Sequence, residues 1–319
     1  MWTIRYAFAP MLRSVFIALS TNRPLRSFSE RNSLGQRLSR RFVAGMRIDE
    51  AVEVVSQLNA EGIEASLDSL GESVVQVSQA EEGAALYHQL LDQIATRKLR
   101  ANISVKLTAM GMDIGGHGAG PDLAERIVGE LVAHAAQTNS FVRLDMESSD
   151  YTEATLRITE RLHSRYPGCV GTVLQAYLYR TAEDAERLLQ QGIRIRLCKG
   201  AYKEPPTVAF PNKADVDANY ARLMQRMATS GIFCGIATHD EALIDRMRGA
   251  VRDGTVAAHA FEFQMLYGVR RDLQRALVSE GFRMRTYVPF GTEWYPYFMR
   301  RLAERPANVL FLAKNLLKS

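Results

Sequence analysis

Residues 170–197 read VGTVLQAYLYRTAEDAERLLQQGIRIRL, and this stretch decides the fold class. It begins with an apolar run, Val170–Ala176, continues through a polar segment of helical character, and ends in a second apolar run, Ile193–Leu197. Short runs of apolar and β-branched residues are typical of buried strands, and strands that are joined through a helix pair in parallel. The stretch therefore predicts a strand–helix–strand unit of an α/β protein.

The same pattern recurs along the chain. Eight runs have the character of strands: Ile63–Leu70, Ile103–Thr108, Phe141–Met146, Val170–Ala176, Ile193–Leu197, Ile232–Ala237, Ala258–Phe263 and Phe282–Val288. The segments between them have a helical period, as in Asp122–Ala136 and Thr152–His163. Eight strands without a Pro/Gly/Ser-rich linker are what a TIM-like (β/α)8 barrel needs. We predict one barrel over residues 61–319 and an N-terminal helical arm over residues 1–60.

The composition is that of an ordinary globular protein: of 319 residues, 47% are hydrophobic, 24% are charged and 3 are Cys. These proportions exclude a disordered or a disulfide-stabilised chain. The net charge of +5 is spread along the chain and no RNA motif or metal-finger spacing accompanies it, so we expect no nucleic-acid partner. Cys169, Cys198 and Cys234 lie in apolar contexts, which predicts buried, reduced thiols and a cytoplasmic location.

The first residues of the chain are apolar, but Arg5 and Arg13 interrupt them. This pattern favours an amphipathic helix over a signal peptide or a membrane span. The first fifty residues are also rich in Arg, for which we favour a solvated helical face over contact with anionic lipid.

Polar residues gather where the predicted strands end, which is where barrel enzymes build their active sites. They are Lys106 and Thr108, Asp145 and Glu147, Gln175, Tyr177 and Tyr179, Arg196, Lys199 and Tyr202, Thr238 and His239, Glu262 and Gln264, and Tyr287. Ionisable groups in otherwise apolar strands need partners or a ligand, because an unpaired buried charge is costly. Two structural alternatives remain open: an ion pair of Lys106 with Asp145, and a core histidine at His239 that is bonded to a backbone carbonyl.

A predicted helix near the C-terminus, Trp294–Glu304, carries a polar face. Tyr297, Arg300, Arg301 and Glu304 stand at positions i, i+3, i+4 and i+7 and so share that face. One interpretation is an Arg–Glu pair that faces solvent. The other is an anion clamp, because two adjacent guanidinium groups offer a forked set of donors that matches a carboxylate.

Seven motifs in this order resemble the bacterial proline dehydrogenase family in its short monofunctional form. They are SVKLT, RLDMES, LQAYLYRT, RLCKGAYKEP, ATHD, FEFQMLYGV and YVPFGTEWYPYFMRRLAERPAN, and the resemblance runs from about Phe42 to Leu312. It implies a distorted (β/α)8 barrel that holds FAD, or FMN in its place, with a C-terminal helix that caps the substrate. It also implies oxidation of L-proline to Δ1-pyrroline-5-carboxylate, the first step of proline catabolism, by hydride transfer from substrate C5 to flavin N5. Reoxidation by a membrane quinone and peripheral contact with the inner face of the membrane are part of the same expectation.

The resemblance also assigns roles to residues. Asp145 and Arg196 would be catalytic, with Arg196 beside the flavin N5. The cofactor would be held by Gln175, Arg196, Lys199, Gly200, Ala201, Tyr202, Thr238 and His239. The substrate carboxylate would be bound by Lys106, Arg300 and Arg301, and its ring by Leu266, Tyr287 and Tyr297, while Glu304 would hold the two arginines in position. Cys198 departs from the family pattern, in which a β-branched aliphatic residue is more usual.

Two other functions remain open from the residues alone. A metal-dependent barrel lyase or isomerase would use Asp145, Glu147, His239 and Glu262 around a divalent cation, with Lys106 as acid or Schiff-base lysine. A catalytically idle barrel that docks on a membrane through its basic N-terminal helices would bind no cofactor. It leaves the polar face of the Trp294–Glu304 helix unexplained.

Overall fold

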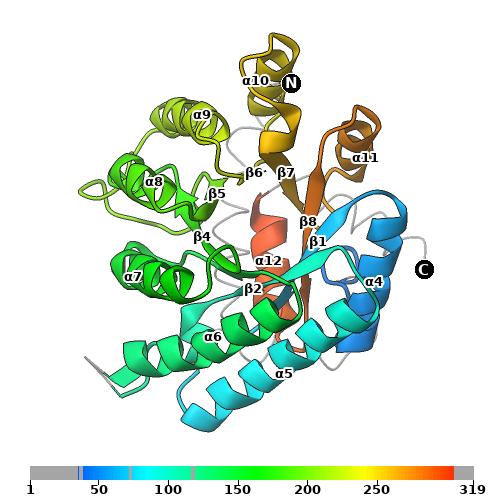
Figure 1. Ribbon diagram of the computed structural model, residues 1–319, viewed down its shortest axis with the longest axis vertical. Coiled ribbons are helices and arrows are strands. Elements are labelled where there is room, and N and C mark those ends of the chain that lie inside the picture. The colour runs from blue at the N-terminus through cyan, green and yellow to red at the C-terminus, as the bar shows by residue number, and fades with distance from the viewer. Residues whose placement is uncertain (1–34, 36–38, 72–73, 116–118, 305–319) are drawn as a thin grey trace.

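The computed structural model describes residues 35, 39–71, 74–115 and 119–304. Its centre is a closed barrel in which every strand is parallel to its neighbours and β8 pairs with β1 (Figure 1). The strands are β1 (Glu64–Ser69), β2 (Ala101–Val105), β3 (Val142–Leu144), β4 (Val170–Gln175), β5 (Arg194–Cys198), β6 (Cys234–Ala237), β7 (Phe261–Leu266) and β8 (Met284–Phe290). The predicted (β/α)8 barrel is confirmed.

Helices form a ring around the outside of the barrel (Figure 1). They are α4 (Ile48–Ala60), α5 (Val77–Thr96), α6 (Ala119–Gln137), α7 (Ser149–Arg165), α8 (Thr181–Gln190), α9 (Lys213–Ala228), α10 (Glu241–Arg252) and α11 (Arg271–Ser279). The predicted helices at 122–136 and 152–163 lie within α6 and α7. Ile127, Val128 and Leu131 of α6 are buried in one apolar cluster with residues of β2 and β3. The apolar stripe of each helix therefore supplies the outer half of the core.

The outer and inner faces of the strands differ. In β2, Ile103 and Val105 belong to the apolar cluster under α5 and α6. Asn102, also in β2, is buried and accepts a hydrogen bond from Ser66 Oγ of β1 at 2.6 Å. Arg196 of β5 reaches the same Ser66, although β5 and β1 are not neighbours in the barrel. These side chains therefore meet inside the barrel, and the prediction of otherwise apolar strands holds for the outer face only.

Most predicted strand bounds lie within about three residues of the observed ones, and at two of them the chain forms another kind of structure. Ala258–Ala260, expected to begin a strand, form a short 3-10 helix, and β7 runs instead from Phe261 to Leu266. Thr108 lies in a second 3-10 helix, Leu107–Met110, directly after β2. Both 3-10 segments contain apolar residues, so the local pattern of hydrophobicity does not distinguish them from a strand.

The cysteines are free thiols, and Cys234 is buried while Cys169 and Cys198 are half-buried. Full burial was thus predicted correctly for Cys234 only. Burial raises the pKa of the Cys198 and Cys234 thiols to about 12 each, so neither is a thiolate at neutral pH.

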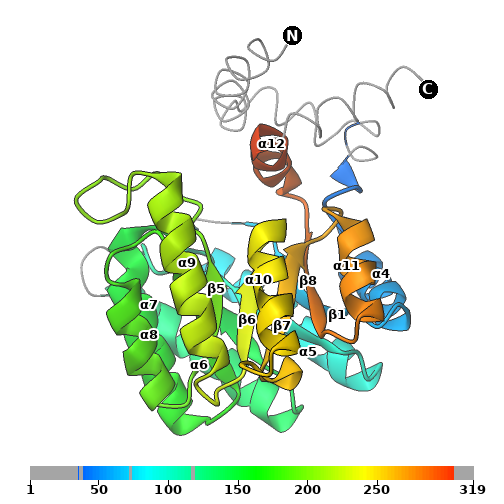
Figure 2. The same cartoon turned by 90° about the horizontal axis from the view of Figure 1, so that it is seen from above.

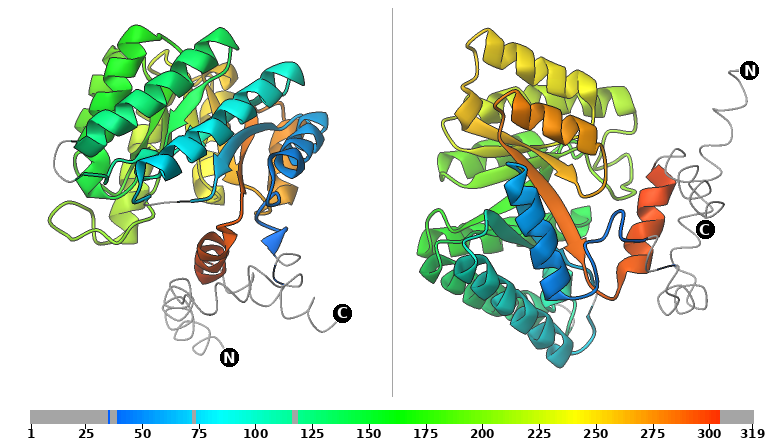
Figure 3. Two further views of the ribbon diagram at one scale, coloured as in Figure 1. Left: turned by 90° about the horizontal axis from the view of Figure 1, so that it is seen from below. Right: turned by 90° about the vertical axis from the view of Figure 1, so that its right-hand side faces the viewer.

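Helix α12 (Trp294–Glu304), which has the predicted bounds, lies beyond the carboxyl ends of the strands (Figures 2 and 3). Trp294 and Phe298 on its apolar face pack with Phe42 and Val43, from the segment before α4. Residues 1–34 and 36–38 of the predicted arm lie outside the described residues, and the boundary at residue 60 stays a prediction. No helix in the described part of the chain has the length and apolar composition to cross a bilayer.

Candidate active site

The polar strand ends converge at the end of the barrel that faces α12. Asp145 follows β3, is 8% exposed and lies at the centre of a hydrogen-bonded cluster. Its Oδ1 accepts hydrogen bonds from Ser104 Oγ at 2.7 Å and from Arg196 Nη1 at 2.8 Å. Its Oδ2 accepts one from the Tyr287 hydroxyl at 2.7 Å. The structure therefore brings together Asp145, Arg196 and Tyr287, which the sequence placed on three different strands.

Tyr287 is held as a hydrogen-bond donor. Burial raises the pKa of the Tyr287 hydroxyl well above its ordinary value, and the neighbouring Asp145 carboxylate adds to that shift. The Arg196 guanidinium carbon lies 5.3 Å from the centre of the Tyr287 ring, within the range of a cation–π contact. Arg196 thus holds the Tyr287 ring in position, and Asp145 holds its hydroxyl.

Asp68 of β1 is a site residue that the sequence analysis missed. Its two carboxylate oxygens lie 2.9 and 3.0 Å from Lys106 Nζ, whereas Asp145 Oδ2 is 4.0 Å from the same nitrogen. Lys106 is therefore paired with Asp68 first and with Asp145 only at the limit of an ion pair. The sequence could have indicated this residue, because Asp68 stands near the end of the first predicted strand. The other site residues stand at the ends of the later predicted strands.

The Lys106–Asp68 ion pair is largely shielded from solvent. The Asp68 side chain is 2% exposed and that of Lys106 is 13% exposed. Burial raises the pKa of the Asp68 carboxyl; Lys106 opposes this shift and the Asp145 carboxylate adds to it. In such surroundings each charge depends on the other, since solvation by water is lost.

A second group of predicted residues lines the strand ends from β4 to β7. Gln175 is buried, donates to the Glu147 carbonyl oxygen at 2.9 Å and accepts a long bond from the Ala201 amide at 3.4 Å. Thr238 is buried, and His239 Nε2 accepts a hydrogen bond from the Leu266 amide at 3.1 Å. This histidine therefore bonds to the backbone, but the partner is an amide and not the carbonyl that the structural alternative named.

Lys199 is paired with two carboxylates. Its Nζ lies 2.5 Å from Asp217 Oδ1 and 2.7 Å from Asp240 Oδ2. Burial lowers the pKa of this amine, but the hydrogen bonds to Asp217 and Asp240 outweigh it and the net shift is upward. Lys199 thus ties β5 to α9 and to the start of α10. Ala201 and Tyr202, which follow it, are exposed.

The predicted substrate-binding residues of α12 differ in their exposure to solvent. Tyr297 is 7% exposed, and Arg300 and Arg301 are half-buried. The Arg301 guanidinium carbon lies 5.1 Å from the centre of the Tyr297 ring. The side chain of Glu304 lies outside the described residues, so its pairing with the arginines stays a prediction.

The four residues of the metal hypothesis are engaged separately. Glu147 accepts from the Thr108 amide and hydroxyl, Glu262 from Arg285 and Gln264, Asp145 from Arg196, and His239 from the Leu266 amide. Within the described ranges, no three His, Cys, Asp or Glu side chains are arranged to hold a metal ion. The geometry does not favour a metal-dependent lyase.

Comparison with known proteins agrees with the motifs. The family model described as proline dehydrogenase matches residues 51–314, most of the chain. The chain belongs to the proline dehydrogenase family. Proline dehydrogenase 1 of Bacillus subtilis (strain 168) is 41% identical over 309 residues, which are 97% of this chain and 100% of the relative. Proline dehydrogenase of Deinococcus radiodurans is 41% identical over 282 residues, 88% of this chain and 90% of the relative.

Solved structures share the family fold. Proline utilization A (PutA) from Bdellovibrio bacteriovorus, in a crystal structure inactivated by N-propargylglycine, superposes with a TM-score of 0.79 at 23% identity. The match covers 92% of this chain and 36% of the PutA chain, so the likeness is to one part of a longer protein. At this identity the likeness shows the fold alone, a distorted (β/α)8 barrel.

Proposed function

We propose that this protein oxidises L-proline to Δ1-pyrroline-5-carboxylate with a bound FAD, the first step of proline catabolism, and that a membrane quinone is the final electron acceptor. The observation that carries the proposal is the cluster of Asp145, Arg196, Tyr287, Lys106 and Asp68 at the carboxyl ends of the strands of a family member. The active sites of (β/α)8-barrel enzymes lie at the carboxyl ends of the strands.

The substrate carboxylate would be bound by Lys106, Arg300 and Arg301. Lys106 contributes a point charge that Asp68 holds in place, and the two guanidinium groups contribute planar donors. Leu266, Tyr287 and Tyr297 would pack around the pyrrolidine ring. Such a site selects a small ring with one anionic end, because both the apolar contact and the carboxylate must be satisfied.

The residues of the second group fit a flavin. Arg196 Nε is buried and has no hydrogen-bond partner among the described residues, so a donor remains for a ligand. Gln175, Lys199, Gly200, Ala201, Tyr202, Thr238 and His239 would hold the remainder of the cofactor, and FMN is the alternative to FAD. When bound, the flavin supplies the acceptor, at N5, for the hydride that leaves proline C5.

The remaining steps fall to the chain itself. Asp145 fixes Arg196 and Tyr287 relative to each other, so that the guanidinium lies ready to stabilise negative charge that develops nearby. Proline must lose its amine proton before the nitrogen lone pair can assist, and the cations around the site favour the neutral amine. The residues thus bind, orient and stabilise charge, and none needs to form a covalent bond.

Gly200 offers a test of the cofactor site. Its φ of +127° is in the range that favours glycine, and a Cβ there would lie 2.4 Å from the Tyr177 ring. We expect Gly200→Ala to bind flavin at least about tenfold more weakly, because the Lys199–Tyr202 segment must shift by more than a hydrogen bond tolerates. Flavin content after dialysis measures this. Gly249→Ala in α10, with nothing within 4 Å of the new methyl group, is the matched control and is expected to retain its flavin.

The proposed activity has a direct test in the visible spectrum. We expect the purified protein to be yellow, and its flavin band to bleach when L-proline is added without oxygen. Pyrrolidine, which lacks the carboxylate, should bleach it far more slowly at equal concentration because the cations find no partner. A colourless, chelator-sensitive protein would point to the metal-dependent lyase, and a colourless protein without activity to the binding module; either outcome rejects the proposal.

A cytoplasmic location with peripheral contact at the membrane follows from the proposed quinone acceptor. The membrane contact would depend on the basic N-terminal residues, which lie outside the described residues.

A further inference from the structure

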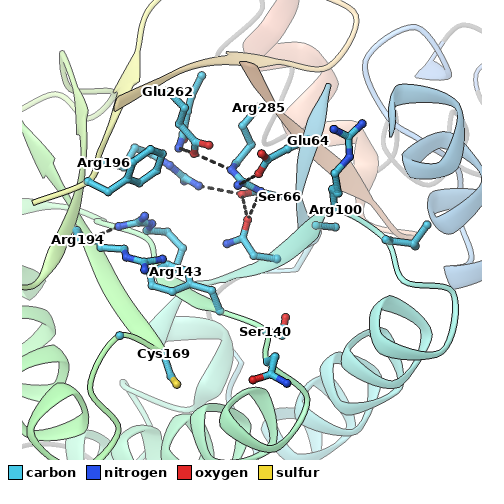
Figure 4. Close-up of a pocket in the computed structure, with 18 of the residues that line it drawn as sticks. Glu64, Ser66, Arg100, Ser140, Arg143, Cys169, Arg194, Arg196, Glu262 and Arg285 are labelled. Carbon is cyan, nitrogen blue, oxygen red and sulfur yellow. Dashed lines mark hydrogen bonds and ion pairs between the residues drawn. The ribbon is translucent and has the colours of Figure 1, made fainter. Parts of the chain in front are cut away.

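A cavity of about 470 Å³ opens at the end of the barrel opposite α12 (Figure 4). Its lining comes from the segments that precede or begin the strands: Leu99–Asn102 at β2, Asn139–Phe141 and Arg143 at β3, Pro167–Cys169 at β4, Arg194 and Arg196 at β5, and Phe233 before β6. The volume is in the range of pockets that bind small organic molecules. Arg196 lies between this cavity and the candidate active site and borders both, whereas Arg143 and Arg194 belong to the cavity alone.

The lining carries more positive than negative charge. Its arginines are Arg100, Arg143, Arg194, Arg196 and Arg285, and its carboxylates are Glu64 and Glu262. Both glutamates pair with Arg285, and Arg196 pairs with Asp145 above the cavity. Within the described part of the chain, Arg100, Arg143 and Arg194 have no carboxylate in ion-pair distance. Three cations around the cavity thus lack a counter-ion.

Arg143 is the deepest of these three cations. It is 5% exposed, its Nη1 donates to the carbonyl oxygens of Thr172 at 2.9 Å and Arg194 at 2.6 Å, and its Nε is buried without a partner among the described residues. Burial, and then the charge of Arg196, lower the pKa of this guanidinium well below its ordinary value. A buried cation that meets only neutral acceptors is costly, and a bound anion would offset that cost.

The surroundings hold this guanidinium in one place. The centre of the Phe141 ring lies 4.7 Å from the Arg143 guanidinium carbon and 5.5 Å from that of Arg194. Gly171 leaves the space that Arg143 fills, because a Cβ there would lie 2.8 Å from Arg143 Nη1 and 2.3 Å from the Arg194 carbonyl oxygen. At the rim, the Ser140 hydroxyl lines the same cavity and has no hydrogen-bond partner among the described residues. Glu262 Oε2, a buried acceptor of the same lining, also has no hydrogen-bond partner among the described residues, but Glu262 pairs with Arg285 and not with Arg143 or Arg194. The donors of Arg143 and Ser140 are therefore not matched by acceptors within the cavity.

We propose that this cavity is a binding site for a small oxyanion, a dicarboxylate or a phosphate, held by Arg143 and Arg194. Two guanidinium groups and a hydroxyl around one space are the donor set that an anion with several oxygen acceptors requires. Neither Arg143 nor Arg194 has a role in the proposed flavin and proline sites, so the inference does not depend on the proposed function.

The test is thermal unfolding of the full-length protein as purified, with increasing sodium phosphate or sodium succinate at constant ionic strength kept with NaCl. We expect the unfolding temperature of the wild type to rise and to saturate with at least one of the two anions, because a ligand that binds only the folded state stabilises it. The anion that saturates at lower concentration identifies the chemical class. Arg143→Met and Arg194→Met should each raise the concentration for half of the effect by at least about tenfold.

Arg222→Met is the matched control. Arg222 lies on α9, is exposed, bonds to Asn219 and forms no ion pair with another described residue, so its removal should leave the anion response unchanged. Arg194 begins β5 and is exposed, so Arg194→Met keeps the proposal testable if the Arg143 variant does not fold. The proposal is overturned if neither anion gives a saturating rise, or if Arg194→Met responds as the wild type does. The second result would place the anion elsewhere, for instance at the proposed flavin or proline sites.

Discussion

Replacing both Arg300 and Arg301 by Met is expected to raise the KM for L-proline by about three orders of magnitude while flavin stays bound. Each guanidinium would contribute charge-assisted hydrogen bonds to the substrate carboxylate, worth roughly 1.5–3 kcal/mol each. Both side chains are half-buried on α12, where water competes with the carboxylate less than on an open surface. Steady-state kinetics with L-proline, together with the flavin spectrum of the same preparation, give the two readouts.

The kinetic constant that changes distinguishes a substrate-binding role of Arg300 and Arg301 from a structural one. The α12 helix is held by Trp294 and Phe298 against Phe42, contacts that the double substitution leaves in place. We therefore expect the unfolding temperature to change little, and kcat to fall less than kcat/KM. A variant with unchanged KM would show that the two arginines form a solvent-facing group and would remove them from the substrate site. Arg222→Met, remote on α9, should have the kinetics of the wild type.

Replacing Lys106 by Met is expected to lower the free energy of unfolding by about 3–5 kcal/mol, in addition to weakening proline binding. The substitution leaves the Asp68 carboxylate, 2% exposed, without its main counter-ion, and removing one partner of a buried pair has a cost of this order. Urea denaturation of the two proteins measures the difference. Since a typical domain is stable by only 5–15 kcal/mol, the loss is large enough to reduce the yield of folded protein.

A second substitution distinguishes the structural from the binding role of Lys106. In Lys106→Met with Asp68→Asn, no uncompensated charge remains, so we expect most of the lost stability to return. The KM for proline should stay high, because the cation that would bind the carboxylate is still missing. If stability does not return, Asp68 is not the partner on which Lys106 depends. If KM returns with stability, Lys106 has no direct contact with substrate.

Much of this protein could be predicted from local patterns. Each of the eight apolar runs overlaps one observed strand, and the helix Trp294–Glu304 has its predicted bounds. The polar residues at the strand ends were also found, because a barrel places those ends together whatever the loops between them do. Local hydrophobic period determines these features, and it is visible in any single segment.

The pairing of charges could not be predicted in this way. Lys106 stands between two strands that each carry a carboxylate, Asp68 on β1 and Asp145 after β3. The sequence analysis named only Asp145 as a possible partner, yet Lys106 Nζ lies 2.9 Å from Asp68 and 4.0 Å from Asp145. The stagger between neighbouring strands decides which oxygen is nearer, and a stagger of a few ångströms leaves no trace in the spacing of residues along the chain.

The strands, their order, the helix that follows the last strand and the polar residues at the carboxyl ends can be read from local sequence, because they depend on residues close together in the chain. The contents of the barrel depend on contacts between distant residues and are visible only in the folded protein. Arg196 and Ser66 are 130 residues apart and meet inside it. Arg143 lies two residues before Asp145, yet it lines the cavity at the opposite end and has no carboxylate in ion-pair distance among the described residues. Closure of the barrel brings such side chains into one small space shielded from water, where the distance between charges sets both their stability and their chemistry.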